Sequence, residues 1–356
     1  MLRDICLKIT GVSKHQYYYQ SKGKRPGKRP TKTTLRQIGD EIEELNNSQI
    51  LDEIINIQQD PETMYGYRKM YFALMTLGYY INHKKVYRIM RENNLLKDPK
   101  KRNERTYAKY RIVTPKQPLE LLEMDIKYVW VEQSRRHAYI LTIIDTFTRY
   151  VLHWQVGFVM KSQQVQHAWE EVIIQYLQYA DMLKKEIHIE VRNDNGPQFA
   201  SKKIQNFFKE NYLNQVFTHP YTPQENGHIE SFHSILSTSI DKEVFWNLME
   251  LENRLHMFYT KYNHHRIHSS IANLSPKMFW NLWDMGKITR IELKNKKQKF
   301  KLNMPYQQLP DNESLKGVPC LNNLTLDEFD YLQKEAIGPE ILQQPPVQRS
   351  PSVVPC

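Results

Sequence analysis

The segment LEMDIKYVW, at residues 122–130, has the composition of a β-strand and carries Asp125 near its middle. A second acidic residue, Asp194, lies in the segment RNDNGPQF, directly after a short apolar run that reads as a buried strand. A third, Glu230, lies in QENGHIESF, which reads as the first turns of a helix. Carboxylates from a strand, a strand end and a helix can converge in an α/β fold, so these three acids are the candidate catalytic residues.

Three converging carboxylates suit a pair of hard divalent cations. Mg²⁺ and Mn²⁺ prefer oxygen ligands, and two such ions about 3.5–4 Å apart activate an attacking oxygen and stabilise a leaving oxygen in phosphoryl transfer. Asp125, fixed by its strand, is the expected ligand of both ions. Asp194 is exposed by the turn at Gly196 and Pro197, and Glu230 completes the shell of the second ion.

The spacing of the acids and the segments around them resemble a known family. Thirty-five residues separate Asp194 from Glu230. The segment HPYTPQENG leads into the glutamate, YNHHRIHSS follows it at residues 262–270, and GVSKHQYYY stands near the N-terminus. Over roughly residues 10 to 280 the chain resembles the DDE transposase/integrase core of the retroviral-integrase superfamily. The likeness is closest to the OrfB half of the OrfA/OrfB insertion-sequence transposases.

This resemblance implies a transposase, a DDE-type polynucleotidyl transferase that cuts and joins DNA strands for a mobile insertion sequence. In that family water first attacks a phosphodiester at the end of the element. The released 3′-OH then attacks a second phosphodiester, often at the other end of the same element. The implied partners are double-stranded DNA at the terminal inverted repeats and the target, further copies of the chain on that DNA, and an OrfA chain, either separate or fused by frameshifting.

The order of elements predicts an α/β, ribonuclease-H-like mixed sheet with flanking helices, preceded by an α-helical helix-turn-helix region. In the earlier region Leu35, Ile38, Ile42 and Leu45 recur at helical spacing, which predicts a further helix. Strands are expected at residues 121–131, 138–145, 150–156 and 187–191, and helices at residues 161–183, 201–211, 224–240 and 244–262.

Residues 65–96 read as the helix-turn-helix. A first helix runs from Arg68, Gly78 permits the turn, and Asn82 caps a second helix. The basic residues of the second helix are expected to stay exposed and to contact phosphate groups. The residues predicted to contact DNA are Arg68, Lys69, Lys84, Lys85, Arg88, Arg91, Lys127, Asn226 and Arg266.

Positive charge is concentrated ahead of the acids. Residues 1–116 hold 24 Lys and Arg against 12 Asp and Glu, whereas residues 117–356 hold 26 against 27. The net charge of +11 therefore arises in the N-terminal part, which predicts a basic DNA-gripping region ahead of a near-neutral catalytic part. A merely soluble basic surface is the alternative.

The three cysteines, Cys6, Cys320 and Cys356, favour a reducing compartment over a disulfide framework. No apolar run approaches the roughly 20 residues that cross a bilayer, and the N-terminus lacks the apolar core of a signal peptide. The chain is therefore predicted to be cytoplasmic, not membrane-bound, and associated with the bacterial nucleoid.

The expected domains follow the shifts in composition. A capping-box pattern in the C-terminal part also predicts a short helix at residues 325–335. The domains are an N-terminal segment with a basic linker at residues 1–32, the helix-turn-helix region at 33–98, a second basic linker at 99–117, an integrase catalytic core at 118–284, and a basic segment with a partly disordered tail at 285–356.

Other residues leave alternatives open. Asp145 is expected to cap a turn rather than bind metal, and the histidines around residue 265 to pack rather than bind zinc. The family commonly has Lys or Arg seven residues after the glutamate and Thr two residues after the first Asp; this chain has Ser237 and Lys127. Ser237 keeps open a DNA-binding protein that has lost strand cutting. A retroelement or phage integrase is the competing enzyme class.

Overall fold

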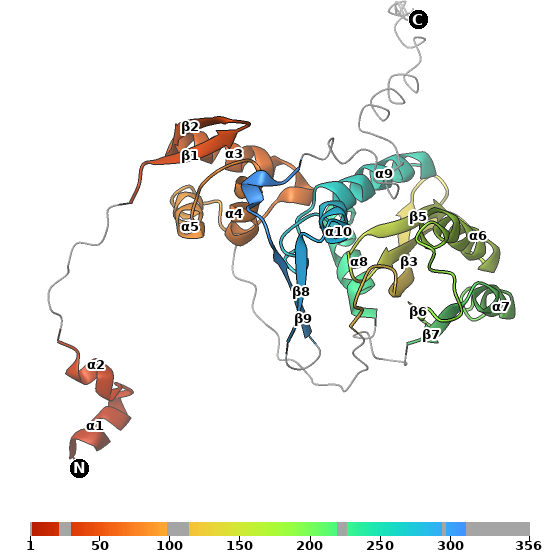
Figure 1. The fold of residues 1–356 in the computed structure, drawn as a ribbon, viewed down its shortest axis with the longest axis horizontal. Helices are drawn as coiled ribbons and strands as arrows, with labels where there is room; N and C mark the ends of the chain where they lie inside the picture. The colour runs from red at the N-terminus through yellow and green to blue at the C-terminus, as the bar shows by residue number, and fades with distance from the viewer. Residues whose placement is uncertain (1, 21–29, 98–113, 219–225, 294–296, 311–356) are drawn as a thin grey trace, which may run out of the picture. The chain divides into compact units, whose positions relative to one another are not determined.

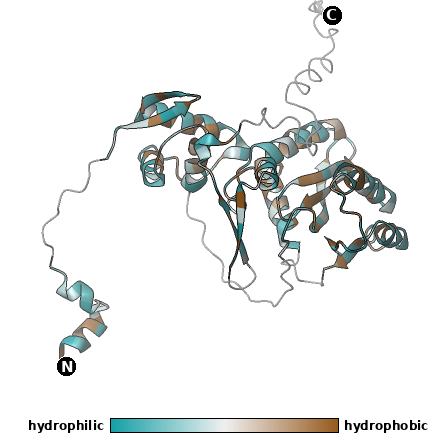
Figure 2. Cartoon of the chain, in the orientation of Figure 1, coloured by the Kyte–Doolittle hydropathy of each residue, from teal (hydrophilic) through white to brown (hydrophobic). Residues whose placement is uncertain are grey.

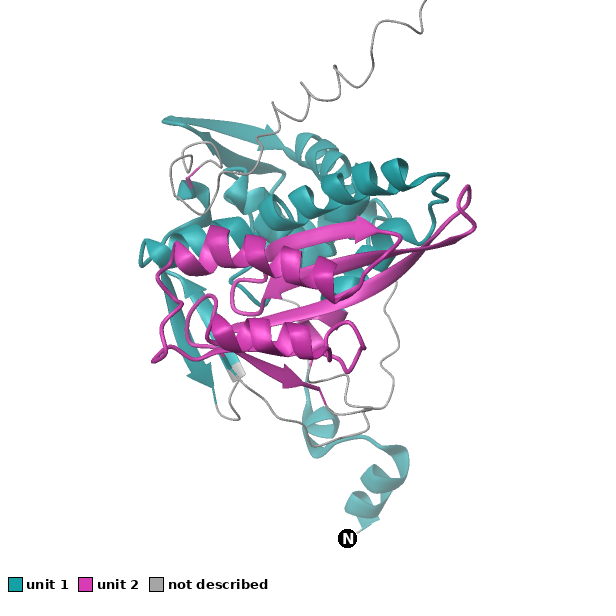
Figure 3. Cartoon of the chain, turned by 90° about the vertical axis from the view of Figure 1, so that its right-hand side faces the viewer, with its two compact units in different colours: residues 1–114, 231–309 teal, residues 115–230, 310–356 magenta. Residues whose placement is uncertain are grey.

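The structure, a computed structural model, describes residues 2–20, 30–97, 114–218, 226–293 and 297–310 (Figure 1). The helix predicted at residues 325–335, most of the predicted linker at 99–117 and the start of the QENGHIESF segment lie outside these residues. The chain divides into two compact units (Figure 3). Unit 1 comprises residues 1–114 and 231–309, and unit 2 comprises residues 115–230 and 310–356.

Unit 2 is built on a five-stranded mixed sheet in the order β5-β4-β3-β6-β7. Its first three strands in sequence pair antiparallel, and the other two add in parallel beside β3. This is the ribonuclease-H-like arrangement that the sequence predicts. The strands are β3 Leu121–Val131, β4 Arg136–Asp145, β5 Val151–Gly157, β6 Ile189–Asn193 and β7 Leu213–Phe217.

Two helices cover one face of this sheet. Helix α6, Ser162–Val172, continues into a π-helical turn at Ile173–Gln178, and α7 spans Lys202–Glu210. The indole N–H of Trp169 on α6 lies 3.1 Å from the sulfur of Met124 on β3, and its ring packs edge-on against Phe208 of α7. Hydrophobic residues are therefore frequent along the strands of this sheet (Figure 2).

A turn at the end of β4 is held by Asp145. Its buried carboxylate accepts hydrogen bonds from the amide and hydroxyl of Thr148, at 2.8 and 2.6 Å, and from the amide of Leu119 at 3.2 Å. This confirms the prediction that Asp145 caps a turn.

Unit 1 contains the helix-turn-helix region and the helices that follow the acids. Helix α8, Gly227–Ile240, begins in unit 2 and continues into unit 1. The other elements of unit 1 are α1 Leu2–Thr10, α2 Lys14–Tyr18, β1 Thr33–Ile38, β2 Glu41–Asn46, α3 Asn47–Gln59, η1 Pro61–Thr63, α4 Tyr67–Thr76, α5 His83–Glu92, α9 Leu248–His264, α10 Pro276–Asp284, β8 Ile288–Leu293, β9 Lys297–Leu302 and η4 Tyr306–Gln308.

The prediction of a helix through Leu35, Ile38, Ile42 and Leu45 is wrong. These residues instead form the antiparallel hairpin of β1 and β2. Gly39 has a φ of +60° and makes the tight turn between the strands. Only Leu45 is buried. The backbone at residues 78–80 supplies hydrogen bonds to β1, and this tertiary pairing overrides the helical spacing.

The helix-turn-helix itself forms as predicted. Asn82 caps α5 by accepting a hydrogen bond from the amide of Lys84 at 2.9 Å. Gly78 has a φ of +90°, and a Cβ there would lie 2.1 Å from the carbonyl oxygen of Gln37. Glycine is therefore required both by the turn and by the close approach of β1. Apolar side chains of α3, α4 and α5 share one core with Leu45 and Ile267.

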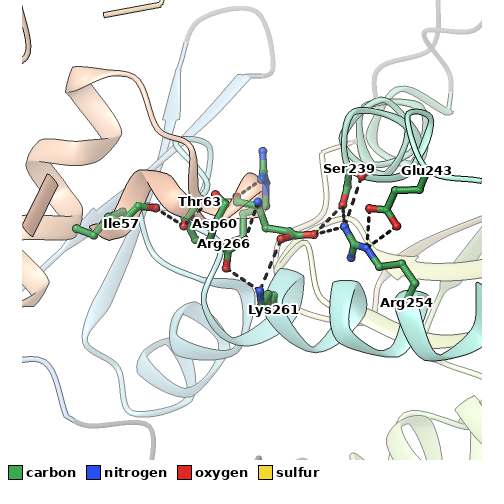
Figure 4. Close-up of polar contacts among 9 residues, drawn as sticks. Ile57, Asp60, Thr63, Ser239, Glu243, Arg254, Lys261 and Arg266 are labelled. Atoms are coloured by element: carbon green, nitrogen blue, oxygen red, sulfur yellow. Dashed lines mark hydrogen bonds and ion pairs between the residues drawn. The ribbon is translucent and has the colours of Figure 1, made fainter. Parts of the chain in front are cut away.

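A polar cluster joins the helix-turn-helix region to helices α8 and α9 (Figure 4). Glu62, 3% exposed, accepts hydrogen bonds from the hydroxyl of Ser239 at 2.7 Å and the guanidinium of Arg254 at 2.8 Å. Lys261 pairs with Asp60 at 2.7 Å. Because breaking a buried ion pair is costly, these contacts fix the region onto the two helices within unit 1.

Candidate active site

Strand pairing brings Asp125 and Asp194 level with each other. Strands β3 and β6 run parallel, with Glu123 opposite Arg192. Continuing this register by two residues places Asp125 opposite Asp194, which follows directly after β6. Neighbouring strands lie about 4.8 Å apart, so Asp125 and Asp194 lie side by side where the interior strand β6 ends.

The electrostatics of Asp194 agree with this placement. Burial raises the pKa of Asp194, and the negative charge of Asp125 raises it further, while a hydrogen bond from the amide of Gly196 lowers it. That amide lies 2.9 Å from the Asp194 carboxylate. A carboxylate whose ionised form is disfavoured by burial and by a neighbouring negative charge is arranged to receive a cation.

A buried carboxylate on the same strand holds the beginning of helix α8. Glu123, 1% exposed, accepts hydrogen bonds from the amides of His228 and Ile229 at 3.1 and 2.8 Å, and its other oxygen lies 2.9 Å from Nδ1 of His228. The first amides of a helix lack partners within it, and its N-terminus favours negative charge. Glu123 therefore caps α8 from strand β3.

Burial and several nearby charges shift the pKa of Glu123 in opposite directions. Burial raises the pKa of Glu123 to about 7, and the charge of Asp125 adds to this effect. The hydrogen bond from Ile229 and the charges of Arg149 and Arg192 act in the opposite direction. Sequence reasoning missed Glu123; the available signal was an acid two residues before Asp125, which places both side chains on one face of the strand.

Glu230 follows the capped residues on the first turn of α8 and is exposed. Within the part of the chain that the structure describes, no three His, Cys, Asp or Glu side chains are close enough to hold a metal ion. The structure therefore brings Asp125 and Asp194 together and ties the glutamate helix to the same strand, but it does not gather all three carboxylates. Ser237, half-buried, lies two turns further along α8.

The basic residues of α5 divide into two kinds. Lys84 and Arg91 are exposed, as predicted. Lys85 instead donates to the carbonyl oxygen of Thr33 at 2.7 Å, and Arg88 donates to that of Thr31 at 3.1 Å. The expectation of full exposure is wrong for Lys85 and Arg88, because strand β1 and the residues before it lie against this helix.

The other predicted DNA contacts also have defined places. Arg68 is exposed, whereas Lys69 is half-buried, and burial lowers its pKa to about 8. Arg266 donates to the backbone carbonyl of Glu62, and Asn226 is buried just before α8. Lys127 is half-buried on the same face of β3 as Asp125.

Three segments of the chain match known protein families. Residues 115–223 and 211–276 each match an integrase core domain, and residues 44–103 match an HTH-like domain. The predicted integrase core and helix-turn-helix region are thereby confirmed. No helix among the described residues is long and apolar enough to cross a membrane.

Several proteins of mobile elements are similar in sequence. The 39.2 kDa protein of insertion element IS476 from Xanthomonas euvesicatoria is 24% identical over 217 residues, which are 60% of this chain and 60% of that protein. InsK, the proposed transposase of insertion sequence element IS150 in Escherichia coli, is 25% identical over 247 residues, covering 66% and 84%. The chain thus spans about three fifths of the first of these relatives. The catalytic core domain of BIV integrase aligns with 48% of this chain and 98% of its own, at 21% identity and a TM-score of 0.35.

Proposed function

We propose, on the premise that this chain belongs to the integrase-core family of insertion-element transposases, that it cuts DNA strands and transfers them to new DNA. Its reaction would be phosphoryl transfer between DNA strands, so the chain would be a polynucleotidyl transferase of the DDE type. The substrate would be double-stranded DNA carrying the ends of an insertion sequence.

One observation supports this proposal most directly. Strand β3 carries Asp125, lies level with Asp194 through its pairing with β6, and caps the helix of Glu230 through Glu123. Strand β3 thus carries one proposed catalytic acid and contacts the segments that carry the other two, although the three segments lie far apart in the sequence. A sheet strand is a rigid support, which a metal-dependent site needs.

The donors fit divalent cations. Asp125 and Asp194 offer carboxylate oxygens, the ligands that Mg²⁺ and Mn²⁺ prefer. Burial raises the pKa of Asp194 and the charge of Asp125 adds to it, and a cation between the two carboxylates would offset both effects. Glu230, one residue beyond Ile229, would be the third ligand. Two bound ions would supply Lewis-acid stabilisation of charge on the phosphodiester.

The remaining residues would position the DNA. Lys127 places a cation on the face of β3 that carries Asp125, where a phosphate group would be attracted. The helix-turn-helix region would bind the duplex through exposed Lys84 and Arg91, and the basic excess of residues 1–116 would add salt-dependent attraction. Further partners would be additional copies of the chain and an OrfA protein at the terminal repeats, on nucleoid DNA.

The test uses the full-length chain and labelled duplexes that carry the DNA flanking its gene. In Mg²⁺ or Mn²⁺ we expect a nick that leaves a 3′-OH at the element end, followed by a joined product, and we expect EDTA to stop both steps. The matched control, Asp181→Asn, changes an exposed acid and should react normally. A wild-type chain that binds these ends but cleaves none of them in either metal would contradict the proposal.

A further inference from the structure

The ribbon formed by β8 and β9 belongs to a strongly basic segment. Residues 287–301 hold seven Lys and Arg against a single acid, Glu292. Strands β8 and β9 pair antiparallel within this segment (Figure 1). The segment lies beyond the residues that match an integrase core or an HTH-like domain. The function proposed above makes no use of this concentration of charge.

One face of the ribbon packs inward and contains the acid. Ile288 and Phe300 are each 6% exposed. The ring of Phe300 lies edge-on to that of Phe279 on helix α10, with 4.8 Å between the ring centroids. Arg290, which lies opposite Phe300, pairs with Glu292 at 3.6 Å. The single carboxylate of the ribbon is therefore on the inner face and is already paired with a cation.

The other face of the ribbon carries lysines. Successive side chains of a strand point to opposite faces, and residues directly opposite each other on paired strands share one face. Thr289 lies opposite Lys301, and Ile291 lies opposite Lys299. All four residues are exposed. This face therefore presents positive charge to the surroundings.

Lys287 lengthens the same face by one position. Its carbonyl oxygen accepts a hydrogen bond of 2.9 Å from the amide of Asn303, so the pairing continues one step past β8 and β9. Lys287 is two residues before Thr289 and is exposed. The surface called here the lysine face consists of Lys287, Thr289, Ile291, Lys299 and Lys301.

The ribbon is held in the same unit as the helix-turn-helix region. The ring of Tyr306, which follows β9, packs against that of Phe72 on helix α4 at 5.0 Å between centroids. The side-chain amide of Gln307 donates a hydrogen bond of 3.1 Å to the carbonyl oxygen of Tyr79. Because the two parts are joined, a duplex held by the helix-turn-helix region would raise the local concentration of phosphate groups around the ribbon.

The spacing of the lysines fits a regular polyanion. Alternate residues of an antiparallel strand lie about 6.8 Å apart, and the phosphates of one strand of B-DNA recur about every 3.4 Å along the helix axis. Lys299 and Lys301 are therefore separated by about two phosphate steps. A two-stranded ribbon also fits the major groove of duplex DNA, which is about 12 Å wide.

We propose that the lysine face binds the phosphate backbone of duplex DNA, as a second contact besides the helix-turn-helix region. That this duplex is the transposition substrate rests on the proposed function. Phosphate contacts fix the position of a duplex but do not read its sequence. The ribbon therefore orients the DNA on unit 1 and leaves sequence recognition to other residues.

The primary experiment measures binding of the full-length chain to two labelled duplexes of unrelated sequence, in EDTA, at about 50 to 200 mM salt. The variant is Lys299→Gln with Lys301→Gln. We expect the slope of log affinity against log salt to be shallower by about 1.8, since each phosphate contact contributes about 0.9. The affinity lost across this salt range should accordingly be about 12-fold smaller than for wild type. Both duplexes should show the same change.

Lys185→Gln with Lys209→Gln is the matched control. It removes the same charge from two exposed positions of unit 2 and should leave the slope unchanged. Lys299→Arg with Lys301→Arg, which keeps the charge, should bind as wild type does. An unchanged slope in the glutamine variant of the ribbon, an equal change in the control, or an effect on only one of the duplexes would overturn the proposal. So would a larger loss of binding to phosphatidylserine vesicles than to duplex DNA, which would assign the face to a membrane.

Binding in EDTA needs no strand cutting, so the two proposals can fail separately. If the slope changes as expected but wild type cuts no element end in Mg²⁺ or Mn²⁺, only the proposed function fails. If wild type cuts the element end and the slope of the ribbon variant is unchanged, only the proposal for the lysine face fails.

Discussion

The carboxylate of Glu123 on strand β3 accepts a hydrogen bond of 2.8 Å from the backbone amide of Ile229 on helix α8, across 106 positions of sequence. The next residue on the helix is Glu230, and Asp125 lies two residues further along the strand. The contact therefore sets the distance between the first and third candidate ligands. Glu123 is a positioning residue, because it acts through the helix rather than on the DNA.

We expect Glu123→Ala to lower the cleavage rate and to raise the Mg²⁺ or Mn²⁺ concentration needed for half-maximal rate by roughly 10-fold, because lost capping frees the helix that carries Glu230. Glu123→Gln, which keeps one acceptor oxygen, should fall between Ala and wild type. Metal titrations of the cleavage rate measure both.

Glu186→Ala, which removes an exposed acid of unit 2, is the matched control and should behave as wild type. A Glu123→Ala chain with lower thermal stability but an unchanged metal requirement would assign Glu123 a purely structural role.

The three candidate ligands should be equally indispensable. We expect Asp125→Asn, Asp194→Asn and Glu230→Gln each to reduce cleavage and joining by at least about 1000-fold, a loss of about 4 kcal/mol of transition-state stabilisation. Each keeps the shape of the side chain but removes its charge. Far-UV circular dichroism and duplex binding should stay close to wild type. Substantial cleavage by any one of them would remove that residue from the site.

The two kinds of basic residue on α5 should separate binding from stability. We expect Lys84→Glu with Arg91→Glu to weaken duplex binding and to reduce the slope of log affinity against log salt, since exposed cations release phosphate counterions. The melting temperature of this double variant should stay close to that of wild type, because both residues are exposed.

Lys85→Glu with Arg88→Glu is the comparison pair and should also lower the melting temperature, since these side chains hold the backbone at Thr31 and Thr33. Equal effects of the two pairs on both measurements would mean that the α5 surface has no special part in DNA binding.

The cluster around Glu62 should govern the stability of unit 1. We expect Arg254→Ala to destabilise the chain by about 3–5 kcal/mol, because it removes the nearer cation of a buried carboxylate and leaves only Lys261, at 3.8 Å. Glu243→Ala, which removes the more exposed partner of Arg254, should cost less than about 1 kcal/mol. Urea unfolding of both variants decides whether the buried pair dominates, and equal losses would contradict it.

The same cluster predicts an acid-sensitive stability. Burial raises the pKa of Glu62, but its contacts with Asp60, Ser239 and Arg254 outweigh burial and bring it to about 2, below the ordinary 4.5. The stabilisation is therefore complete above about pH 4.5 and is lost as the pH falls toward 2. Glu62→Gln should flatten the pH dependence of unfolding across that interval; an unchanged slope would show that Glu62 does not titrate there.

Local sequence determined several strands, a turn and a helix cap of this protein. The strands around Asp125 and Asp194, the turn at Asp145 and the cap at Asn82 form where they were predicted. Each depends on residues close in the sequence: an apolar run, a carboxylate beside free amides, or a side-chain oxygen at a helix start. Such interactions need no distant partner, so the sequence predicts them directly.

Only the tertiary structure decided the features that depend on distant partners. Leu35 and Ile42 have helical spacing but lie in a hairpin, because the backbone at residues 78–80 pairs with β1. The short strand β7 exists because β6 offers it hydrogen bonds. From the sequence alone, Glu123 is an ordinary charged residue of a strand, but in the structure it caps a helix 106 residues away. The free energy of these contacts comes from groups that meet only after the chain has folded. A local sequence pattern therefore cannot predict them.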